Sequence, residues 1–202
     1  MFSKIAAPLI LFLIFSQSIM ATNFSREDRQ FEVLANKYIA ELMQNNPEWA
    51  TTLGEHKFDD RLDDYSLAAV RRDRNFALNY LKQLKEISPA KLSKVNNIDY
   101  RIMAHSLEYS LFRLDVLREY EWNPMTYNVG GALNSLISRD FGPLKDRLMS
   151  AKARLLLVPQ VVENAKLNLK NPPKVFTETA IAQNKGTINL IKGDLQMYID
   201  EA

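Results

Sequence analysis

Residues 45–66, NNPEWATTLGEHKFDDRLDDYS, hold the group of side chains that could most readily do chemistry. One of the two histidines of the chain, His56, lies there, and residues 55–64 hold five carboxylates with it: Glu55, Asp59, Asp60, Asp63 and Asp64. Imidazole and carboxylate groups bind zinc, and carboxylate oxygens also bind calcium. The stretch therefore raises two hypotheses, a metal or catalytic site and a charged loop between helices.

A zinc site needs at least three protein ligands, commonly His or Cys with a carboxylate. The chain has only His56 and His105 and no cysteine, and it lacks the peptidase pattern His-Glu-x-x-His. His105 and Glu108 lie one helical turn apart, so a site made by His56, His105 and Glu108 is geometrically conceivable. We favour a core or half-buried position for His105, because it falls among apolar residues at helical spacing.

The aspartates also differ from a calcium-binding loop. An EF-hand alternates its oxygen ligands, turns at a glycine and ends with a glutamate at position twelve. Neither the alternation nor the glycine is found among Asp59, Asp60, Asp63 and Asp64. Lys57 and Arg61 beside them indicate local ion pairs, each worth about 0–1 kcal/mol when exposed. We interpret the stretch as a structural loop and predict no catalytic or metal-binding residue in this chain.

Helices must position this loop, because apolar residues recur at helical spacing and no strand pattern is present. The sequence predicts a first helix capped by Ser25 and stopped at Asn46. A short helix should begin at Pro47 and end at Gly54, which can adopt the left-handed conformation. Ser66 should cap a third helix.

Five more helices are predicted downstream. One runs from about residue 95 to 121, with a seam whose spacing suits lengthwise packing against other helices: Ile98, Ile102, His105, Tyr109, Phe112 and Val116. A short helix covers about 132–137, and another begins near Leu144. Pro159 is a break or the first turn of the next helix, which carries Val162, Ala165 and Leu169 and is stopped at 171–173. Thr177 should cap the last, with Glu178 in its first turn. The predicted fold class is all-α, an irregular bundle of about eight helices.

Residues 1–21 have the pattern of a secretory signal peptide. Lys4 precedes eleven apolar residues, 5–15, and small residues lead to Ala21. Eleven residues rise only about 16 Å as a helix, against about 30 Å of hydrocarbon, so cleavage is favoured over a permanent span. We place the cleavage after Ala21, with Ser18 as the alternative. The mature chain, 22–202, should then be secreted or periplasmic, with no stable membrane span.

Net charge argues against two classes of partner. The formal charge of +2 becomes +1 when Lys4 leaves with the signal peptide, and no run of Lys or Arg is present. We therefore expect no nucleic-acid partner and no binding to anionic membranes. The lack of cysteine excludes a disulfide and a lipid-bearing cysteine in this sequence.

Three stretches carry a resemblance to one bacterial family: residues 45–66, 139–169 (RDFGPLKDRLMSAKARLLLVPQVVENAKLNL) and 172–191 (PPKVFTETAIAQNKGTINLI). Their order and spacing resemble those of the domain of unknown function 885 family, whose members are secreted or lipid-anchored helical proteins. The shared pattern is an Asn-Pro helix end, an Ala-Thr-x-x-Gly corner, a His-x-x-Asp-x-Arg-Leu loop, an RDFxPL turn and a TETAI segment. The matching positions are Asn46, Pro47, Ala50, Thr51, Gly54, His56, Asp59, Arg61, Leu62, Arg139, Asp140, Phe141, Pro143, Leu144, Thr177, Glu178, Thr179, Ala180 and Ile181.

The resemblance implies a zinc-dependent peptidase or hydrolase for a full-length member, whose His-Glu-Ala-x-Pro-Gly-His-His motif lies in the C-terminal half. Nothing in residues 186–202 resembles that motif. No metal ligand is therefore carried over, and zinc is implied only for a full-length member. On this interpretation residues 22–202 are an N-terminal scaffold or substrate-cleft portion that is inactive alone. Its partners would be the missing C-terminal half and a peptide substrate.

Two sets of residues follow as candidates. We expect structural roles for Gly54, Asp59, Arg139, Asp140 and Pro143, with Arg139 holding carbonyls or a carboxylate where the chain turns at 142–143. Contacts with a substrate are the hypothesis for His56, Arg61 and Glu178. A different hypothesis is a freestanding periplasmic module that binds a protein or peptide through aromatic residues near turns, Trp49, Trp122 and Tyr127.

Overall fold

The computed structural model describes residues 25–201, so the predicted signal peptide lies outside the described residues. The α-helices are α1 (Arg26–Asn45), α2 (Pro47–Leu53), α3 (Leu67–Lys85), α4 (Lys94–Phe112), α5 (Gly130–Ser138), α6 (Leu144–Asn168), α7 (Lys174–Asn189) and α8 (Leu195–Glu201). Short 3-10 helices cover His56–Phe58, Pro89–Lys91, Glu119–Glu121 and Pro124–Tyr127, and π-helical turns cover Arg113–Leu117 and Leu190–Asp194. Residues 25–201 contain no strand, and the predicted all-α irregular bundle is confirmed.

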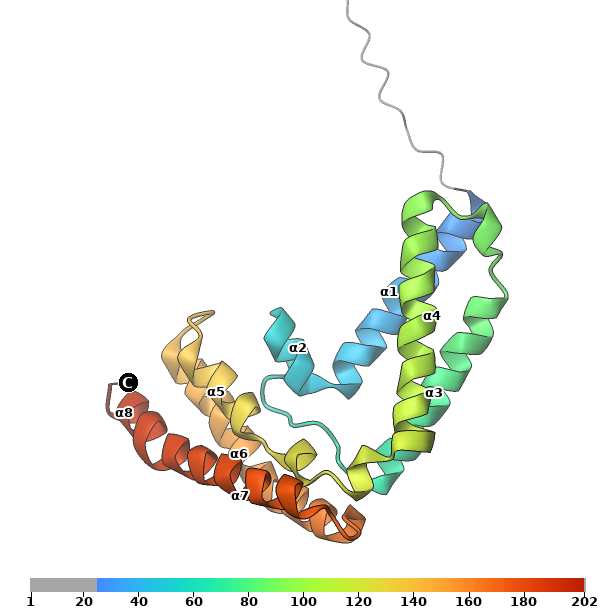
Figure 1. Ribbon diagram of the computed structural model, residues 1–202. Helices are drawn as coiled ribbons and strands as arrows, with labels where there is room; N and C mark the ends of the chain where they lie inside the picture. The colour runs from blue at the N-terminus through green and yellow to red at the C-terminus, as the bar shows by residue number, and fades with distance from the viewer. Residues whose placement is uncertain (1–24, 202) are drawn as a thin grey trace, which may run out of the picture.

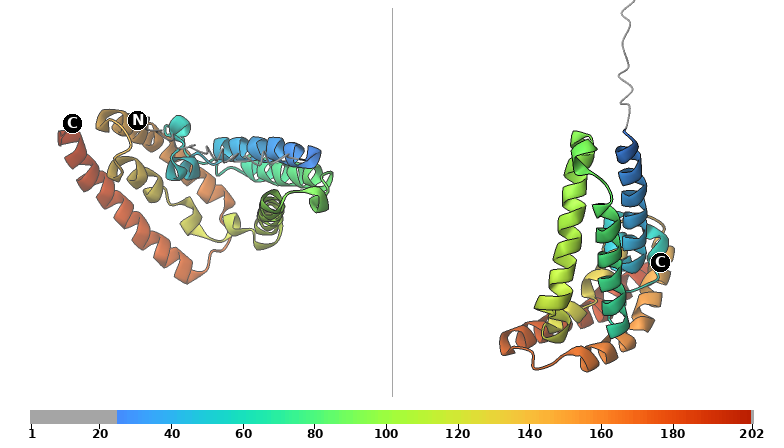
Figure 2. Two further views of the ribbon diagram at one scale, coloured as in Figure 1. Left: turned by 90° about the horizontal axis from the view of Figure 1, so that it is seen from above. Right: turned by 90° about the vertical axis from the view of Figure 1, so that its right-hand side faces the viewer.

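The helices form two groups (Figure 1). α1, α3 and α4 stand side by side and are called the arm below, and the second view of Figure 2 shows them next to one another. The base consists of α5, α6, α7 and α8. Between the two groups lies the corner, defined as α2 with the loop that follows it to residue 65. No helix in the described range is long and apolar enough to cross a membrane.

The predicted starts of the first three helices are confirmed, because each depends on local chemistry. The Ser25 hydroxyl accepts from the Asp28 amide at 2.9 Å, and the Asp28 carboxylate accepts from the Ser25 amide at 3.1 Å. Ser66 caps α3 by accepting from the Ala69 amide. Gly54 ends α2 with φ of 91°, a conformation that glycine adopts without steric cost.

Three predicted boundaries are wrong. The helix expected to reach residue 121 ends earlier: α4 passes into the π-helical turn and stops at Arg118, whose left-handed φ of 50° reverses the chain. Pro159 does not break α6; proline costs that helix one internal hydrogen bond, and the turns around it are fixed by packing of Val158 and Val161. α7 begins at Lys174, so Thr177 lies inside the first turn and donates to the Pro173 carbonyl.

Apolar side chains from all three helices fill the arm. The buried set is Phe31, Leu34, Tyr38, Ala77, Tyr80, Leu84, Ile87, Met103 and Leu107. The base has two smaller groups, centred on Leu133 with Val161 and on Leu136 with Ala151. The arm and the base thus each bury an apolar interior, and the corner connects them.

The seam predicted for α4 is the exposed side of the helix, and the opposite side packs into the arm. Met103 and Leu107 face the arm interior, whereas Ile102 is 58% exposed and His105 is also exposed. The helix carries apolar residues on two opposite faces, and their spacing alone does not reveal which face packs. The expectation that His105 is a core or half-buried histidine is therefore wrong.

Candidate functional site

A fully buried arginine holds the corner against the base. Arg154 of α6 has no exposed surface. Its Nη1 donates to the Ala132 carbonyl of α5 at 2.7 Å, and its Nη2 donates to the Thr51 hydroxyl of α2 at 2.6 Å and to the Pro47 carbonyl at 3.4 Å. Burial lowers the pKa of Arg154, while the carboxylates of Glu48 and Asp59 oppose that shift. Three helices are thus joined at one guanidinium group.

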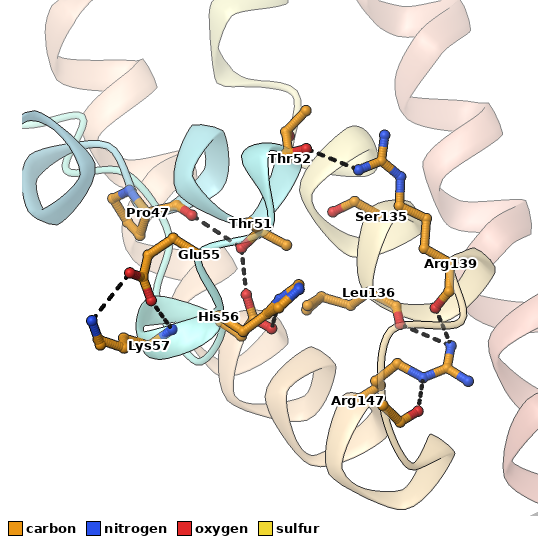
Figure 3. A network of polar contacts seen from close by, with 12 residues as sticks. Pro47, Thr51, Thr52, Glu55, His56, Lys57, Ser135, Leu136, Arg139 and Arg147 are labelled. Carbon is orange, nitrogen blue, oxygen red and sulfur yellow. Dashed lines mark hydrogen bonds and ion pairs between the residues drawn. The ribbon is translucent and has the colours of Figure 1, made fainter. Parts of the chain in front are cut away.

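A chain of hydrogen bonds leads from this arginine to the surface, and Figure 3 shows the part of it around Thr51 and His56. The Thr51 hydroxyl, which accepts from Arg154, donates to Oδ1 of Asp59 at 2.6 Å. Oδ2 of Asp59 lies 2.9 Å from Nδ1 of His56. The side chain of Asp59 is 9% exposed and that of His56 is 34% exposed. Among the side chains of this hydrogen-bond network, the imidazole of His56 is therefore the one that solvent or a ligand can reach.

The His56 loop also meets the turn of residues 139–144. The rings of His56 and Phe141 stack with their centres 3.8 Å apart and their planes 7° apart. Arg139 donates from Nη1 to the Thr52 carbonyl at 3.0 Å, which ties the same turn to α2. Two blocks that lie more than 80 residues apart in sequence are thus neighbours in the fold.

Arg147, which the sequence analysis did not single out, holds the turn itself. It is buried, and its Nη1 donates to the carbonyls of Ile137 at 3.0 Å and of Arg139. Its Nε donates to the Gly142 carbonyl at 2.9 Å. The carbonyl-holding role expected of Arg139 at this turn is therefore performed by Arg147, as Figure 3 shows.

The remaining predicted residues lie in different surroundings. Gly54 ends α2, and Pro143 directly precedes α6. The side chain of Asp140 is 96% exposed, 3.4 Å from Nη2 of Arg147. Arg61 is exposed and lies over the Phe58 ring. Glu178 is exposed on α7, where it pairs with Lys174 at 3.7 Å. Of the three proposed substrate-binding residues, the structure places His56 in the network of the corner, whereas Arg61 and Glu178 lie outside it.

A second polar group of the corner borders a cavity of about 400 Å³ between the corner and the arm. The amides of Glu48 and Asp63 donate to each other's carboxylates at 3.2 and 3.1 Å, and the Tyr65 hydroxyl donates to Glu48 at 3.0 Å. Burial, and next the charge of Glu48, raises the pKa of Asp63 to about 7. Burial also raises the pKa of Asp73, which lines the same cavity.

Glu48, Arg147 and Arg154 are the polar residues that the sequence analysis missed. The signal available for Arg154 is its position beside Ala151 and Leu155 in the apolar stripe of its helix, where a charged side chain must find partners when it is buried. Its partners lie 22 to 107 residues away, and the spacing of a single sequence does not identify them.

Ligands for a metal ion do not converge in the described part of the chain. Residues 25–201 bring together no group of three or more His, Asp or Glu side chains placed to hold an ion. His56 lies in the corner, whereas His105 and Glu108 lie on the exposed face of α4. The conceivable site from His56, His105 and Glu108 is therefore not formed in this structure.

The hydrogen-bond network is arranged to fix the helices in place and not to catalyse a reaction. Arg154, Thr51 and Asp59 are buried and their hydrogen bonds are directed at one another or at carbonyls. A general acid or base must instead reach a proton of the substrate within about 3 Å. Only the imidazole of His56 combines a bond to the network with access from outside.

Comparisons with known proteins cover most of the chain. A family model described as "Bacterial protein of unknown function (DUF885)" matches residues 47–201. The chain is similar to a solved structure, "a putative lipoprotein of unknown function from Shewanella oneidensis", with a TM-score of 0.81 and 28% identity. The match covers 85% of this chain and 32% of that chain, so this chain spans about a third of the length of the solved one. A comparison with curated proteins gave no match.

Proposed function

The chain belongs to the DUF885 family of bacterial proteins of unknown function, and on this premise we propose that residues 22–202 are the N-terminal helical scaffold of an exported hydrolase. The observation that carries the proposal is the match of 85% of this chain to only a third of a longer chain with the same fold. The scaffold would support a cleft for a peptide substrate, and it would be inactive alone. The zinc chemistry of the whole protein rests on the family resemblance.

The metal-binding groups that this chain offers support the proposal that it is inactive alone. A zinc-activated water needs a closed set of ligands around one open position. His56 and His105 belong to different helical groups, and no cysteine is available. The described residues therefore do not fit a zinc ion, and no reaction step is assigned to them.

The corner supports the scaffold role. Arg154, Asp59 and Arg147 use buried, charge-assisted bonds to fix α2 and the turn at residues 139–144 on the base. Such bonds are directional, so they hold one relative position of the elements more strictly than apolar contacts do. A wall of a substrate cleft requires this kind of fixed position.

Export is supported by two features. Residues 1–21 have the signal-peptide pattern, and the similar solved chain is described as a lipoprotein. The present sequence has no cysteine to carry a lipid, so we propose release into the periplasm or medium after cleavage near Ala21. Sequencing of the N-terminus of the secreted product tests this point.

The central experiment compares two purified proteins, residues 22–202 and the full-length Shewanella oneidensis protein. We expect stoichiometric zinc by mass spectrometry and cleavage of a peptide library only in the full-length protein. Stoichiometric zinc and peptide cleavage by residues 22–202 alone would overturn the scaffold proposal. A full-length protein without hydrolase activity would overturn the hydrolase part.

Substitutions in the full-length protein separate contact with substrate from support of the fold. At the positions equivalent to His56, Arg61 and Glu178, each alanine variant is tested for turnover and for its thermal midpoint. Reduced turnover at an unchanged midpoint supports contact with substrate. A reduced midpoint with turnover retained in the folded fraction supports a structural role, which we expect for His56 because of its bond to Asp59.

Two of the three aromatic residues that motivated a freestanding binding module have partners inside the chain. Trp122 donates from Nε1 to the Leu117 carbonyl at 2.7 Å and contacts the Phe176 ring. The Tyr127 hydroxyl donates to the Tyr120 carbonyl. Trp49 remains 40% exposed. These contacts favour the scaffold over the binding module.

A further inference from the structure

α4 and the π-helical turn that follows it carry a line of six exposed apolar side chains, called the α4 stripe: Val95, Ile98, Ile102, Tyr109, Phe112 and Val116. Each is between 44% and 68% exposed. Together with His105 they follow alternating spacings of three and four residues, the pattern of a helix that packs against another helix by knobs into holes. The stripe continues beyond Phe112 into the π-helical turn.

The opposite face of the same helix is already packed. Met103 and Leu107 are 5% and 1% exposed in the arm interior. A helix with apolar residues on both faces is typical of the interior of a larger body. Single exposed apolar residues are ordinary, but six in one helical register form a continuous surface that marks an interface.

We propose that the α4 stripe is the docking seam for an α-helix of the polypeptide that the longer family fold adds to this portion. The inference rests on the proposed function, because it requires a larger body. Its support is the solved relative, which repeats this fold with a TM-score of 0.81 and has about two thirds of its length outside the match. The stripe is about 32 Å long, so a partner helix of about 20 residues would cover it.

The chemistry of the stripe defines its partner. The centre requires aliphatic or aromatic residues at the same alternating spacing. Asp99, Arg101 and Glu108 border the stripe, so the partner helix should carry charges of both signs at its flanks. The occupant is thus an amphipathic helix with mixed charged edges.

A second copy of this chain is the competing occupant. An antiparallel pairing of two α4 helices about the middle of the stripe would place Glu108 near Arg101 of the other copy, and the light-scattering experiment below tests for that dimer. A parallel pairing would place the two His105 side chains against each other within the seam. In addition, Arg113 and Asp115 already pair with Glu119 and Arg74 of their own chain, at 3.1 and 2.9 Å.

The solved relative gives a direct test by superposition. The positions equivalent to Ile98, Ile102 and Phe112 should be buried there by residues outside the matched third. Exposed side chains at these positions would overturn the proposal.

The second test uses Ile102→Lys in residues 22–202 and at the equivalent position of the full-length Shewanella oneidensis protein. We expect an unchanged thermal midpoint in the short chain, where the side chain is exposed, and a midpoint lower by about 5–10 °C in the long protein, where it would be buried. Val33→Lys is the matched control, because Val33 is 71% exposed on the arm and lies off the stripe. It should leave both midpoints unchanged.

Two results would overturn the inference. One is an unchanged midpoint in the long protein carrying the stripe substitution. The other is a dimer of residues 22–202 in light scattering that Ile102→Lys dissociates, because a second copy would then cover the stripe. Both readouts are independent of zinc and turnover, so they fail separately from the hydrolase proposal.

Discussion

The arm joins its helices through rings and aliphatic side chains such as Phe31, Tyr80 and Leu107, whereas the corner joins α2 to the base through Arg154, Thr51 and other polar groups. Apolar contact is non-directional, and a core tolerates exchanges that conserve volume. A buried polar network instead loses much of its value when one member is removed, because the others remain desolvated. Substitutions in the arm should therefore lower the stability of the fold in proportion to the volume they change. Removal of a single member of the corner network should lower it by a large step.

The largest expected effect comes from Arg154→Met in the corner. Methionine fills the space of the side-chain stem but leaves the acceptors at Ala132, Thr51 and Pro47 without their donor. We expect a loss of about 3–5 kcal/mol in the free energy of unfolding, measured by urea denaturation. Arg139→Met, which removes one bond of an exposed arginine, is the control and should cost about 1 kcal/mol or less. Equal losses in the two variants would remove the distinction drawn for the corner.

In the arm, Leu107→Ala should cost about 2–4 kcal/mol, because it leaves a cavity at a residue that is 1% exposed. Ile102→Ala on the opposite face of α4 should change the free energy of unfolding by less than about 0.5 kcal/mol. Denaturation of both variants measures how far the two faces of one helix differ. A large loss from Ile102→Ala in residues 22–202 would contradict the exposed position of the stripe.

The pH dependence of stability should differ in sign between Asp63 in the corner and Asp28 in the arm. Burial raises the pKa of Asp63 from 3.8 to about 7, so at pH 5 the folded chain holds a proton that the unfolded chain has released. This contribution is fully present below about pH 4 and is lost as the pH rises to about 7, a change of about 1–3 kcal/mol. Urea midpoints at pH 5 and pH 8 should therefore fall with rising pH, and Asp63→Asn should reduce that fall. An unaltered slope in the variant would contradict the assignment to Asp63.

In the arm, hydrogen bonds from the Ser93 amide, the Asn96 side chain and Ser25 lower the pKa of Asp28. The stability from this carboxylate is present above its unfolded pKa of 3.8 and is lost as the pH falls below that value. Titration of the urea midpoint from pH 5 to pH 2 should show this loss, and Asp28→Asn should reduce it. A midpoint that holds constant to pH 2 would show that Asp28 has no such role.

The control variants aside, the smallest expected effect is that of Ser25→Ala at the start of the arm. The variant loses the hydroxyl that accepts from the Asp28 amide, and it should cost about 1 kcal/mol. Ser66→Ala removes the corresponding cap of α3 and should cost a similar amount. A neutral result for both would show that the helix starts are fixed by packing alone.

The features that were predictable from sequence are those set by neighbours along the chain. Ser25, Ser66 and Gly54 determine helix ends within a few residues, and the spacing of apolar residues determines the all-α class. The burial of Arg154 depends on residues about 100 positions away, so no local sequence pattern predicts it. The side of α4 that packs is equally undetermined, because both faces are apolar. Pro159 was misjudged because tertiary packing outweighs one lost hydrogen bond.

The bonds from Arg154 to Thr51 and Pro47 close segments of 103 and 107 residues, whereas the arm is complete at residue 112. During synthesis the chain leaves the ribosome N-terminus first, so the arm can form before Arg154 has been made. Until then water binds the Thr51 hydroxyl. With the arm folded, mainly residues 113–154 remain flexible, and closing them costs about 3 kcal/mol of chain entropy. The polar partners return little of it until all are in place. We therefore expect the joint between arm and base to form late in folding and to be cleaved first when a protease is present during refolding.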